Sequence, residues 1–281
     1  MIQTYTYTSL NKGPHVLFFG AIHGNEVCGP RALAQVMKEL DSGKLQLQKG
    51  SATFVPVCNP AAYAQNLRLT EENLNRIFKP TKTPRSYEAQ MANVLCNLVD
   101  QCDVLLDIHS TTAKGEPFMY LDFPTKTNRA WAEVLGPTGA VVGWPELYKK
   151  FGKSHTSFDT TTYAHSRGKD TLLVECGQHK AASATGVAYN AVRNTLAHYA
   201  LVAEQTHNYK PALAKITNGF FRNEGEALAN PTWKHMDRVK KGAALINTKN
   251  KPVVAPHDGY IIMPKFDAAV GQDWLYFGRD L

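Results

Sequence analysis

The chain has 281 residues, of which 43% are hydrophobic and 20% charged, so it is long and apolar enough to bury a core. That composition excludes a disordered chain, and no apolar stretch is long enough to span a bilayer. The net charge of +7 comes without a basic helix or a long Lys/Arg cluster, which argues against nucleic-acid binding. A mild positive field would instead attract a small anionic substrate. A homo-oligomer is compatible with the sequence, which carries no signal of oligomeric state.

The N-terminal stretch MIQTYTYTSLNKG lacks a basic segment followed by an apolar one. We therefore expect no signal peptide and a cytoplasmic location. The five cysteines are odd in number, and no pair has C-x-x-C spacing. This disfavours a disulfide framework and a thiolate zinc site, so we expect buried thiols in a reducing compartment.

Strand-like apolar runs alternate with helix-like segments along most of the chain. Short apolar runs bounded by turn residues predict strands, and apolar residues at helical spacing predict helices. The predicted elements are strands at 15–22, 52–58, 104–108, 139–144 and 171–176, and helices at 29–40, 86–100 (capped by Ser86), 128–135 and 183–205. This alternation predicts an α/β fold with a mainly parallel, doubly wound sheet.

The character of the sequence changes near residue 206. Short β-type runs follow one another there, separated by Gly, Pro, Asn or Asp. This pattern predicts a small all-β domain at 206–281, after a larger domain at 1–205.

Residues able to do chemistry follow four of the predicted strands. In open parallel sheets, ligands bind outside the carboxyl ends of the strands, so these residues are expected at one edge of the sheet. They are His23 and Glu26 after the first strand, Arg68, Asn75 and Arg76 after the second, His109 after the third, and Glu175 at the end of the late strand. Each residue alone is weak evidence, but their shared placement predicts a single site.

Two histidines and one carboxylate form a ligand set typical of catalytic zinc, with the fourth position left open. His23 and Glu26 are three residues apart on a turn, and His109 arrives from a neighbouring strand. Thiolates are absent from the set, which disfavours a structural zinc. We therefore expect one Zn²⁺ per chain, held by these three residues. Asp107 shares a strand face with His109, and either orients that imidazole or is a plain buried carboxylate with backbone partners.

Metal-assisted hydrolysis needs a base that takes a proton from water and passes it to the leaving nitrogen. Glu175, inside the apolar segment TLLVECG, is the candidate. Arg68 is the candidate cation beside the developing oxyanion. Asn75 and Arg76 are adjacent and would clamp a substrate carboxylate, although a surface position explains this pair equally well on its own.

Together, the segments GAIHGNE, NP…R…NLNRIF, DIHS and LLVECG resemble the succinylglutamate desuccinylase/aspartoacylase family, part of the wider zinc carboxypeptidase (M14-like) fold. The resemblance spans about residues 15–205, in the family's order. It also implies a C-terminal β domain that shapes the entrance to the site. The roles it implies are zinc ligands for His23, Glu26 and His109, general acid/base for Glu175, carbonyl polarisation for Arg68, and a carboxylate clamp for Asn75 with Arg76.

Two features fit the family pattern less closely. In aspartoacylases a Y-x-x-x-R stretch before the catalytic Glu contributes to substrate binding, and here YAHSR offers Tyr163 and Arg167 at a shorter spacing from Glu175. Family members often have an acidic residue where this chain has Asn73, two positions before the asparagine of the NR pair. That difference leaves the substrate less certain.

These residues predict a zinc-dependent hydrolase that removes the acyl group from a small anionic N-acyl amino acid. A metallocarboxypeptidase acting on small peptides would use the same site with a different pocket, and a non-catalytic metal-binding protein is a third interpretation. A dinucleotide enzyme is excluded, since no G-x-G-x-x-G follows a predicted strand. The acyl group and the amino acid stay open, because they depend on loops within 110–170, including a wall expected at 110–118, and on the C-terminal domain.

Overall fold

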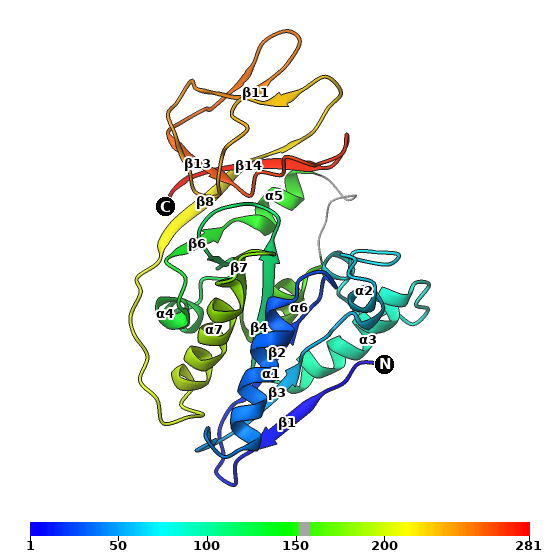
Figure 1. The fold of residues 1–281 in the computed structure, drawn as a ribbon, viewed down its shortest axis with the longest axis vertical. Coiled ribbons are helices and arrows are strands. Elements are labelled where there is room, and N and C mark those ends of the chain that lie inside the picture. The colour runs from blue at the N-terminus through cyan, green and yellow to red at the C-terminus, as the bar shows by residue number, and fades with distance from the viewer. Residues whose placement is uncertain (152–157) are drawn as a thin grey trace.

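The computed structural model describes residues 1–151 and 158–281. The strands before residue 205 are β1 (Tyr5–Thr8), β2 (His15–Gly20), β3 (Ser51–Val55), β4 (Val104–Thr111), β5 (Phe118–Tyr120), β6 (Gly139–Val142) and β7 (Asp170–Gln178). The later strands are β8 (Ala212–Phe221), β9 (Ala227–Leu228), β10 (Arg238–Val239), β11 (Ala244–Asn247), β12 (Val253–Val254), β13 (Gly259–Ile262) and β14 (Asp273–Asp280). Eleven strands form one sheet in the order β1-β3-β2-β4-β7-β5-β6-β8-β14-β13-β10, and β12-β11-β9 form a smaller one (Figure 1).

The large sheet is mixed, with five parallel and five antiparallel neighbouring pairs. The run β3-β2-β4-β7 is parallel, as predicted. However, β5 pairs antiparallel with β7, and β14, β13 and β10 follow β8 in antiparallel pairs. The predicted mainly parallel sheet is therefore corrected to a mixed one. A three-residue strand such as β5 carries too little pattern to recognise, and short C-terminal strands give no sign of which sheet they join.

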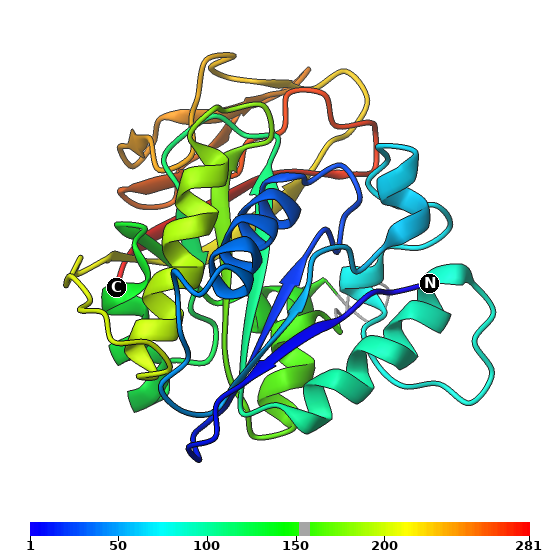
Figure 2. The ribbon, with the colours of Figure 1, turned by 60° about the horizontal axis from the view of Figure 1, so that its bottom comes forward.

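Helices cover both faces of the parallel strands (Figure 2). Side chains alternate along β2, so Val16 and Phe18 lie on one face of the sheet while Leu17 and Phe19 lie on the other. The first core contains residues of α1 (Cys28–Asp41), α4 (Lys126–Leu135) and α7 (Ala184–His198). The second core contains residues of η1 (Leu74–Arg76), α3 (Tyr87–Gln101) and α6 (Thr160–Ser166). The two remaining helices are α2 (Pro60–Ala64) and α5 (Trp144–Lys150). Burial of both faces explains why β2 reads as a continuous apolar run. Within the described residues, no helix has both the length and the apolar character to cross a bilayer.

Most predicted elements are present, with ends shifted by a few residues. The Ser86 side chain accepts a hydrogen bond from the Ala89 amide at the start of α3, which confirms the predicted cap. β3 ends at Val55, because Pro56 has no amide hydrogen with which to continue the ladder. The predicted helix after β7 ends at His198, earlier than expected.

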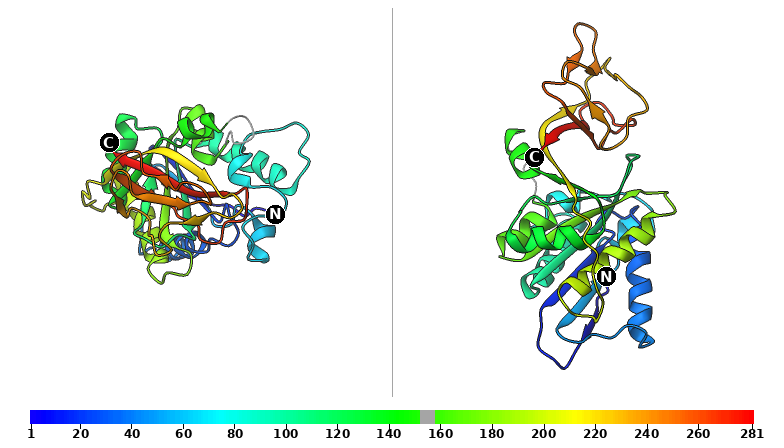
Figure 3. Two further views of the ribbon diagram at one scale, coloured as in Figure 1. Left: turned by 90° about the horizontal axis from the view of Figure 1, so that it is seen from above. Right: turned by 90° about the vertical axis from the view of Figure 1, so that its left-hand side faces the viewer.

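In the described part of the chain, all regular elements after residue 206 are strands, and they lie at one end of the molecule (Figure 3). The first of them, β8, pairs with β6, so the large sheet is continuous across the predicted domain boundary. A core cluster also crosses that boundary, since Trp144 of α5 packs with Ile216 and Tyr276. The two predicted domains therefore share a sheet and a core.

Candidate active site

The pairing of the parallel strands brings the predicted site residues to one edge of the sheet. His109 of β4 and Glu175 of β7 are directly paired neighbours. β2 pairs with the other side of β4 and ends at Gly20. The turn after β2 then places His23 and Glu26 at the same edge, where all four side chains line one pocket.

Close packing and one strained residue shape the turn after β2. The Glu26 amide donates to the carbonyl of His23 at 3.1 Å, which closes the turn. Ala21 has a φ of 46°, in the left-handed region that costs a non-glycine residue energy. Gly24 packs so tightly on α2 that a Cβ there would lie 2.2 Å from the carbonyl carbon of Ala62. The segment GAIHGNE therefore holds its two polar side chains on a constrained backbone.

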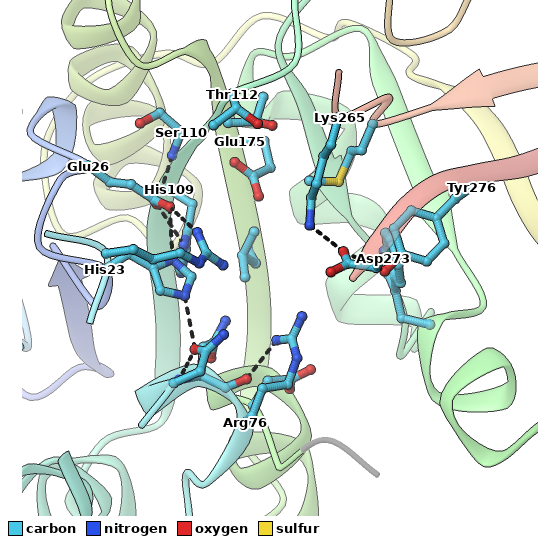
Figure 4. A pocket seen from close by; sticks show the side chains of 18 of the residues that line it. His23, Glu26, Arg76, His109, Ser110, Thr112, Glu175, Lys265, Asp273 and Tyr276 are labelled. Atoms are coloured by element: carbon cyan, nitrogen blue, oxygen red, sulfur yellow. Dashed lines mark hydrogen bonds and ion pairs between the residues drawn. The ribbon is translucent and has the colours of Figure 1, made fainter. Parts of the chain in front are cut away.

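Three buried side chains, called the metal cluster below, converge at this edge: His23, Glu26 and His109 (Figure 4). Their ligand atoms all lie within 4.8 Å of one another. His23 Nδ1 lies 2.8 Å from Glu26 Oε1, and His109 Nδ1 lies 2.9 Å from Glu26 Oε2. The structure thus brings together the three residues predicted as zinc ligands.

Asp107 holds the outer nitrogen of His109. Its Oδ2 lies 2.8 Å from His109 Nε2 and also accepts a hydrogen bond from the Thr160 hydroxyl. Of the two interpretations that the sequence leaves open, these contacts support the orienting role. Because Nε2 is committed to Asp107, Nδ1 is the nitrogen that His109 offers to an ion.

The charges within the cluster suit a cation. Burial favours neutral Glu26, but the two histidines outweigh it and lower the pKa of Glu26 well below its usual range. Burial, together with the charge of Arg68, lowers the pKa of His23 to about 3, so this imidazole is neutral. Burial also opposes a charge on His109, but Asp107 and Glu26 outweigh it and raise the pKa of His109 well above its usual range. Without a metal, His109 therefore holds a proton, which a metal ion would displace. The donor set is then an ionised carboxylate between two buried imidazoles, without a thiolate, and it fits zinc.

Glu175 is buried beside this cluster and has one oxygen without a partner. It is 6% exposed, and the Tyr120 hydroxyl lies 3.5 Å from its Oε1. Within the described residues, its Oε2 is buried and makes no hydrogen bond. Burial, followed by the charge of Glu26, raises the pKa of Glu175 to about 8. A carboxyl group in this state is suited to take up and release a proton.

Glu88 of α3 fixes the loop that carries the two predicted arginines. Its carboxylate accepts hydrogen bonds from the amide and the hydroxyl of Thr70, both at 2.7 Å, and from Asn59 Nδ2 at 3.2 Å. The amides of Glu71 and Glu72 also donate to it. Burial alone would raise the pKa of Glu88, but these hydrogen bonds outweigh it and lower the pKa. A buried, ionised Glu88 therefore organises the loop.

The two arginines are placed differently. Arg68 is exposed, and its guanidinium lies 3.1 Å from Glu26 Oε1, beside the metal cluster. Arg76 is partly buried and donates to the Asn75 carbonyl at 2.8 Å and to the Tyr148 hydroxyl at 2.9 Å. In the part of the chain that the structure describes, Arg76 forms no ion pair with a carboxylate. Its charge is therefore available to an anion in the pocket.

Asn73 and Asn75 connect the predicted carboxylate clamp, which is Asn75 with Arg76, to the metal cluster. The Asn75 side-chain oxygen accepts a hydrogen bond from the Thr160 amide at 3.0 Å. Asn73 Oδ1 lies 3.1 Å from His23 Nε2 and accepts from the Asn75 amide at 3.0 Å. The outer nitrogen of His23 therefore meets a neutral amide, whereas that of His109 meets a carboxylate. Asn73 is the position where family members often have an acidic residue.

A cavity of about 410 Å³, a size suited to a small molecule, opens onto these groups. Seven predicted site residues line it: His23, Glu26, Arg68, Asn75, Arg76, His109 and Glu175. The wall expected at 110–118 contributes Ser110, Thr111 and Thr112. Two further groups, which the sequence does not predict, line the cavity. They are the aromatic residues Tyr120, Trp144, Tyr148 and Tyr276, and the ion pair of Lys265 with Asp273. No local pattern marks these residues, because they reach the pocket through packing between distant segments.

Tyr163 and Arg167 do not reach the pocket. The Tyr163 hydroxyl lies 3.0 Å from Asp100 Oδ1, and its ring packs 5.8 Å from that of Phe78. Arg167 Nε forms an ion pair with the same Asp100 oxygen at 2.7 Å. α6 begins at the site with Thr160, but these two residues lie farther along, where they connect α6 to α3. The substrate contact predicted for them is therefore corrected to a structural one.

Curated relatives match part of the chain. A probable aspartoacylase from Prochlorococcus marinus subsp. pastoris is 31% identical over 103 residues, which are 35% of this chain and 34% of that protein. An N-acyl-aromatic-L-amino acid amidohydrolase (carboxylate-forming) from Rattus norvegicus is 36% identical over 107 residues, which are 34% of this chain and 32% of that protein. The chain thus spans about a third of the length of these curated relatives.

Solved structures match nearly the whole chain. A succinylglutamate desuccinylase/aspartoacylase from Rhodobacter sphaeroides has a TM-score of 0.80 at 18% identity, over 100% of this chain and 89% of that one. The product-bound ectoine utilization protein EutE (DoeB) from Ruegeria pomeroyi has a TM-score of 0.79 at 20% identity, over 98% of this chain and 88% of that one. At these identities the likeness shows a shared fold.

A family model extends over most of the chain. The model of the succinylglutamate desuccinylase/aspartoacylase catalytic domain matches residues 12–199. The matched range contains the metal cluster, the loop of the two arginines and Glu175. The chain therefore belongs to the succinylglutamate desuccinylase/aspartoacylase family.

Proposed function

We propose that the protein is a zinc-dependent hydrolase that cleaves the amide bond of a small, anionic N-acyl amino acid. The observation that carries the proposal is one shared pocket. It contains the metal cluster, the proton-accepting Glu175, and Arg76, whose charge has no carboxylate partner among the described residues. The names of the relatives, an aspartoacylase and an N-acyl-aromatic-L-amino acid amidohydrolase, support the same class of reaction.

Glu175 would carry the proton in this reaction. Zinc held by the metal cluster would supply a Lewis acid for the amide carbonyl and lower the pKa of water. The ionised carboxylate of Glu175 accepts a proton from the attacking water and then passes it to the leaving nitrogen. Its Oε2, buried and without a partner among the described residues, is the atom suited to this transfer. The products are a free amino acid and a carboxylic acid.

The two arginines would divide the remaining charge between them. Arg68 lies beside Glu26 and would stabilise the negative charge that develops on the carbonyl oxygen. Arg76 would bind the substrate carboxylate, with Asn75 beside it in the pocket. The Tyr148 hydroxyl, bonded to Arg76 at 2.9 Å, would hold the guanidinium in place.

We also propose that residues 206–281 form a small β domain that shapes the entrance to a carboxypeptidase-type catalytic domain at 1–205. The support is that Lys265, Asp273 and Tyr276 line the pocket from this part of the chain (Figure 4). A β domain at the entrance would limit the substrate to small molecules. We therefore favour deacylation over the trimming of peptides. The cytoplasmic location stays a prediction of the sequence.

The first test measures zinc content and hydrolysis on the same samples. The substrates are N-acetylaspartate, N-succinylglutamate, other N-acetyl amino acids and a short peptide. We expect about one zinc per chain and cleavage of an N-acyl amino acid, with both lost in His23→Ala. The matched control, His207→Ala, changes an exposed histidine away from the pocket and should retain both.

Each other outcome selects a different interpretation. Zinc with cleavage of the peptide alone would favour the metallocarboxypeptidase. Zinc without cleavage of any substrate would favour a non-catalytic metal-binding protein. Absence of zinc from both the parent protein and the control would overturn the proposal.

A further inference from the structure

Four aromatic residues, called the aromatic wall below, line one side of the pocket: Tyr120, Trp144, Tyr148 and Tyr276. Trp144 lies at their centre, with ring centroids 5.1 Å from Tyr120, 5.8 Å from Tyr148 and 4.5 Å from Tyr276. These spacings are those of packed aromatic pairs, so the wall is a single unit.

The polar ends of the wall are already engaged. The Tyr120 hydroxyl donates to Met263 Sδ at 3.1 Å, and the Tyr276 hydroxyl donates to Asp273 at 3.0 Å. The Tyr148 hydroxyl accepts from a guanidinium nitrogen, as described above. The wall therefore offers a substrate ring faces and edges, together with the hydroxyl hydrogen of Tyr148, for which no acceptor is found among the described residues. Trp144 Nε1 is buried and has no partner in the described part of the chain.

The wall connects the proton-transfer group to the carboxylate clamp. At one end the Tyr120 hydroxyl lies 3.5 Å from Glu175 Oε1, and at the other the Tyr148 hydroxyl lies 2.9 Å from Arg76. In the proposed reaction the leaving amino acid has its nitrogen at Glu175 and its carboxylate at Arg76. Both groups are attached to the same Cα, so its side chain projects into the space that the wall borders.

The charged residues close to the wall do not provide a second anion site. Lys265 forms an ion pair with Asp273, which also accepts the Tyr276 hydroxyl. Asp159 is committed to the N-terminus of α6, where it accepts from the Thr162 amide at 2.6 Å. An acidic side chain on the amino acid would therefore find Lys265 already neutralised.

We propose that the amino acid released by this enzyme has an aromatic or other large apolar side chain, which packs against the aromatic wall. This inference rests on the proposed function and specifies its substrate class. A cavity of about 410 Å³ accommodates such a side chain together with the reacting amide. Rings packed against Trp144 and its neighbours would gain both apolar burial and ring–ring contact.

The test compares substrates that differ only in the amino acid side chain. We expect kcat/KM for N-acetyl-L-phenylalanine to exceed that for N-acetyl-L-alanine by at least about tenfold, and N-acetyl-L-aspartate to be poorer still. Binding of free L-phenylalanine and L-aspartate to the zinc-loaded protein is measured by calorimetry in parallel. A preference for aspartate in both measurements, or equal values for all side chains, would overturn the inference.

The binding measurement separates this inference from the proposed function. If no acyl amino acid is cleaved but L-phenylalanine binds in preference to L-aspartate, the proposed reaction is wrong and the aromatic subsite stands. If an acyl amino acid is cleaved with a preference for acidic side chains, the reaction stands and the aromatic subsite is wrong.

Variants at the centre of the wall make the test specific. Trp144→Leu should reduce the preference for phenylalanine over alanine by at least about fivefold, and Trp144→Phe should retain most of it. The matched control is Trp131→Leu. Trp131 is a buried tryptophan of α4 in the first core, away from the pocket, so its substitution should leave the preference unchanged. A preference that Trp144→Leu leaves intact would contradict the inference. The preference of the parent protein tests it even if Trp144→Leu lowers the yield of folded protein.

Discussion

The parallel strands β2, β4 and β7 and the antiparallel pair β13 and β14 contribute different residues to one pocket. The parallel strands and the turns after them carry the metal cluster and Glu175, which in the proposed reaction act on the bond to be broken. The C-terminal strands and their loops contribute Lys265, Asp273 and Tyr276, which face that cluster from the other side of the cavity (Figure 4).

The residues of the parallel strands are positioned by the register of the sheet, whereas Lys265 is positioned by a loop. His109 and Glu175 are neighbours through the register of a buried sheet, and a slip of one residue would turn either side chain to the opposite face. Lys265 lies on the loop between β13 and β14, where backbone changes cost less. The position of His109 and Glu175 is therefore tied to the register of the sheet, whereas the loop that carries Lys265 is able to vary without disturbing that register.

If the parallel strands carry the chemistry, the largest loss of activity should follow a substitution of Glu175. Glu175→Gln preserves the shape of the side chain but removes the group that accepts a proton, so kcat should fall about 1,000-fold while zinc content is unchanged. The measurement is steady-state hydrolysis of the best N-acyl amino acid, together with metal analysis. Glu146→Gln, on the exposed face of α5, is the matched control and should keep its activity. Full activity in Glu175→Gln would mean that Glu175, and with it the parallel part of the sheet, does not supply the proton-transfer group.

The same variant predicts a smaller effect on stability. With no metal bound, the folded pKa of Glu175 is about 8, above the usual value of 4.5 for a glutamate. A group with a raised folded pKa contributes stability that is complete below about pH 4.5 and is lost as the pH rises through about 8. In chelator-treated samples, the Tm of the parent protein should therefore fall relative to Glu175→Gln over this interval, by at least about 2 °C. Titratable groups that both proteins share contribute equally to the two Tm values and cancel in their difference. A difference in Tm that stays constant with pH would therefore contradict the raised pKa of Glu175.

The sequence predicts the parallel half of the molecule well because its signals are local. Both faces of β2 and β4 are buried, so these strands appear as unbroken apolar runs. Their carboxyl ends must then lie at one edge, which is enough to bring His23, Glu26 and His109 together. Asp107 is predicted as a possible partner of His109 from strand alternation alone, and the observed contact of 2.8 Å supports that role.

The failures share a cause, since each depends on packing between segments that are distant in sequence. Tyr163 and Arg167 have a motif-like spacing, but the direction of α6 carries them to Asp100 and away from the pocket. Trp144 and Tyr276 meet only because β8 joins the large sheet and β14 follows it. That pairing cannot be predicted from a single sequence, so the aromatic wall is visible only in the structure.

The smallest predicted effect tests the C-terminal side of the comparison. Lys265→Met breaks the ion pair with Asp273 and leaves a negative charge facing the pocket, which opposes binding of an anionic substrate. Both partners are partly exposed, so the pair is worth at most about 1 kcal/mol, and KM should rise by less than about fivefold with kcat and zinc content unchanged. The measurement is a Michaelis–Menten series beside Lys251→Met, an exposed lysine outside the pocket, as the control. A large fall in kcat for Lys265→Met would mean that the C-terminal strands take part in the chemistry, and the division between the two regions would be wrong.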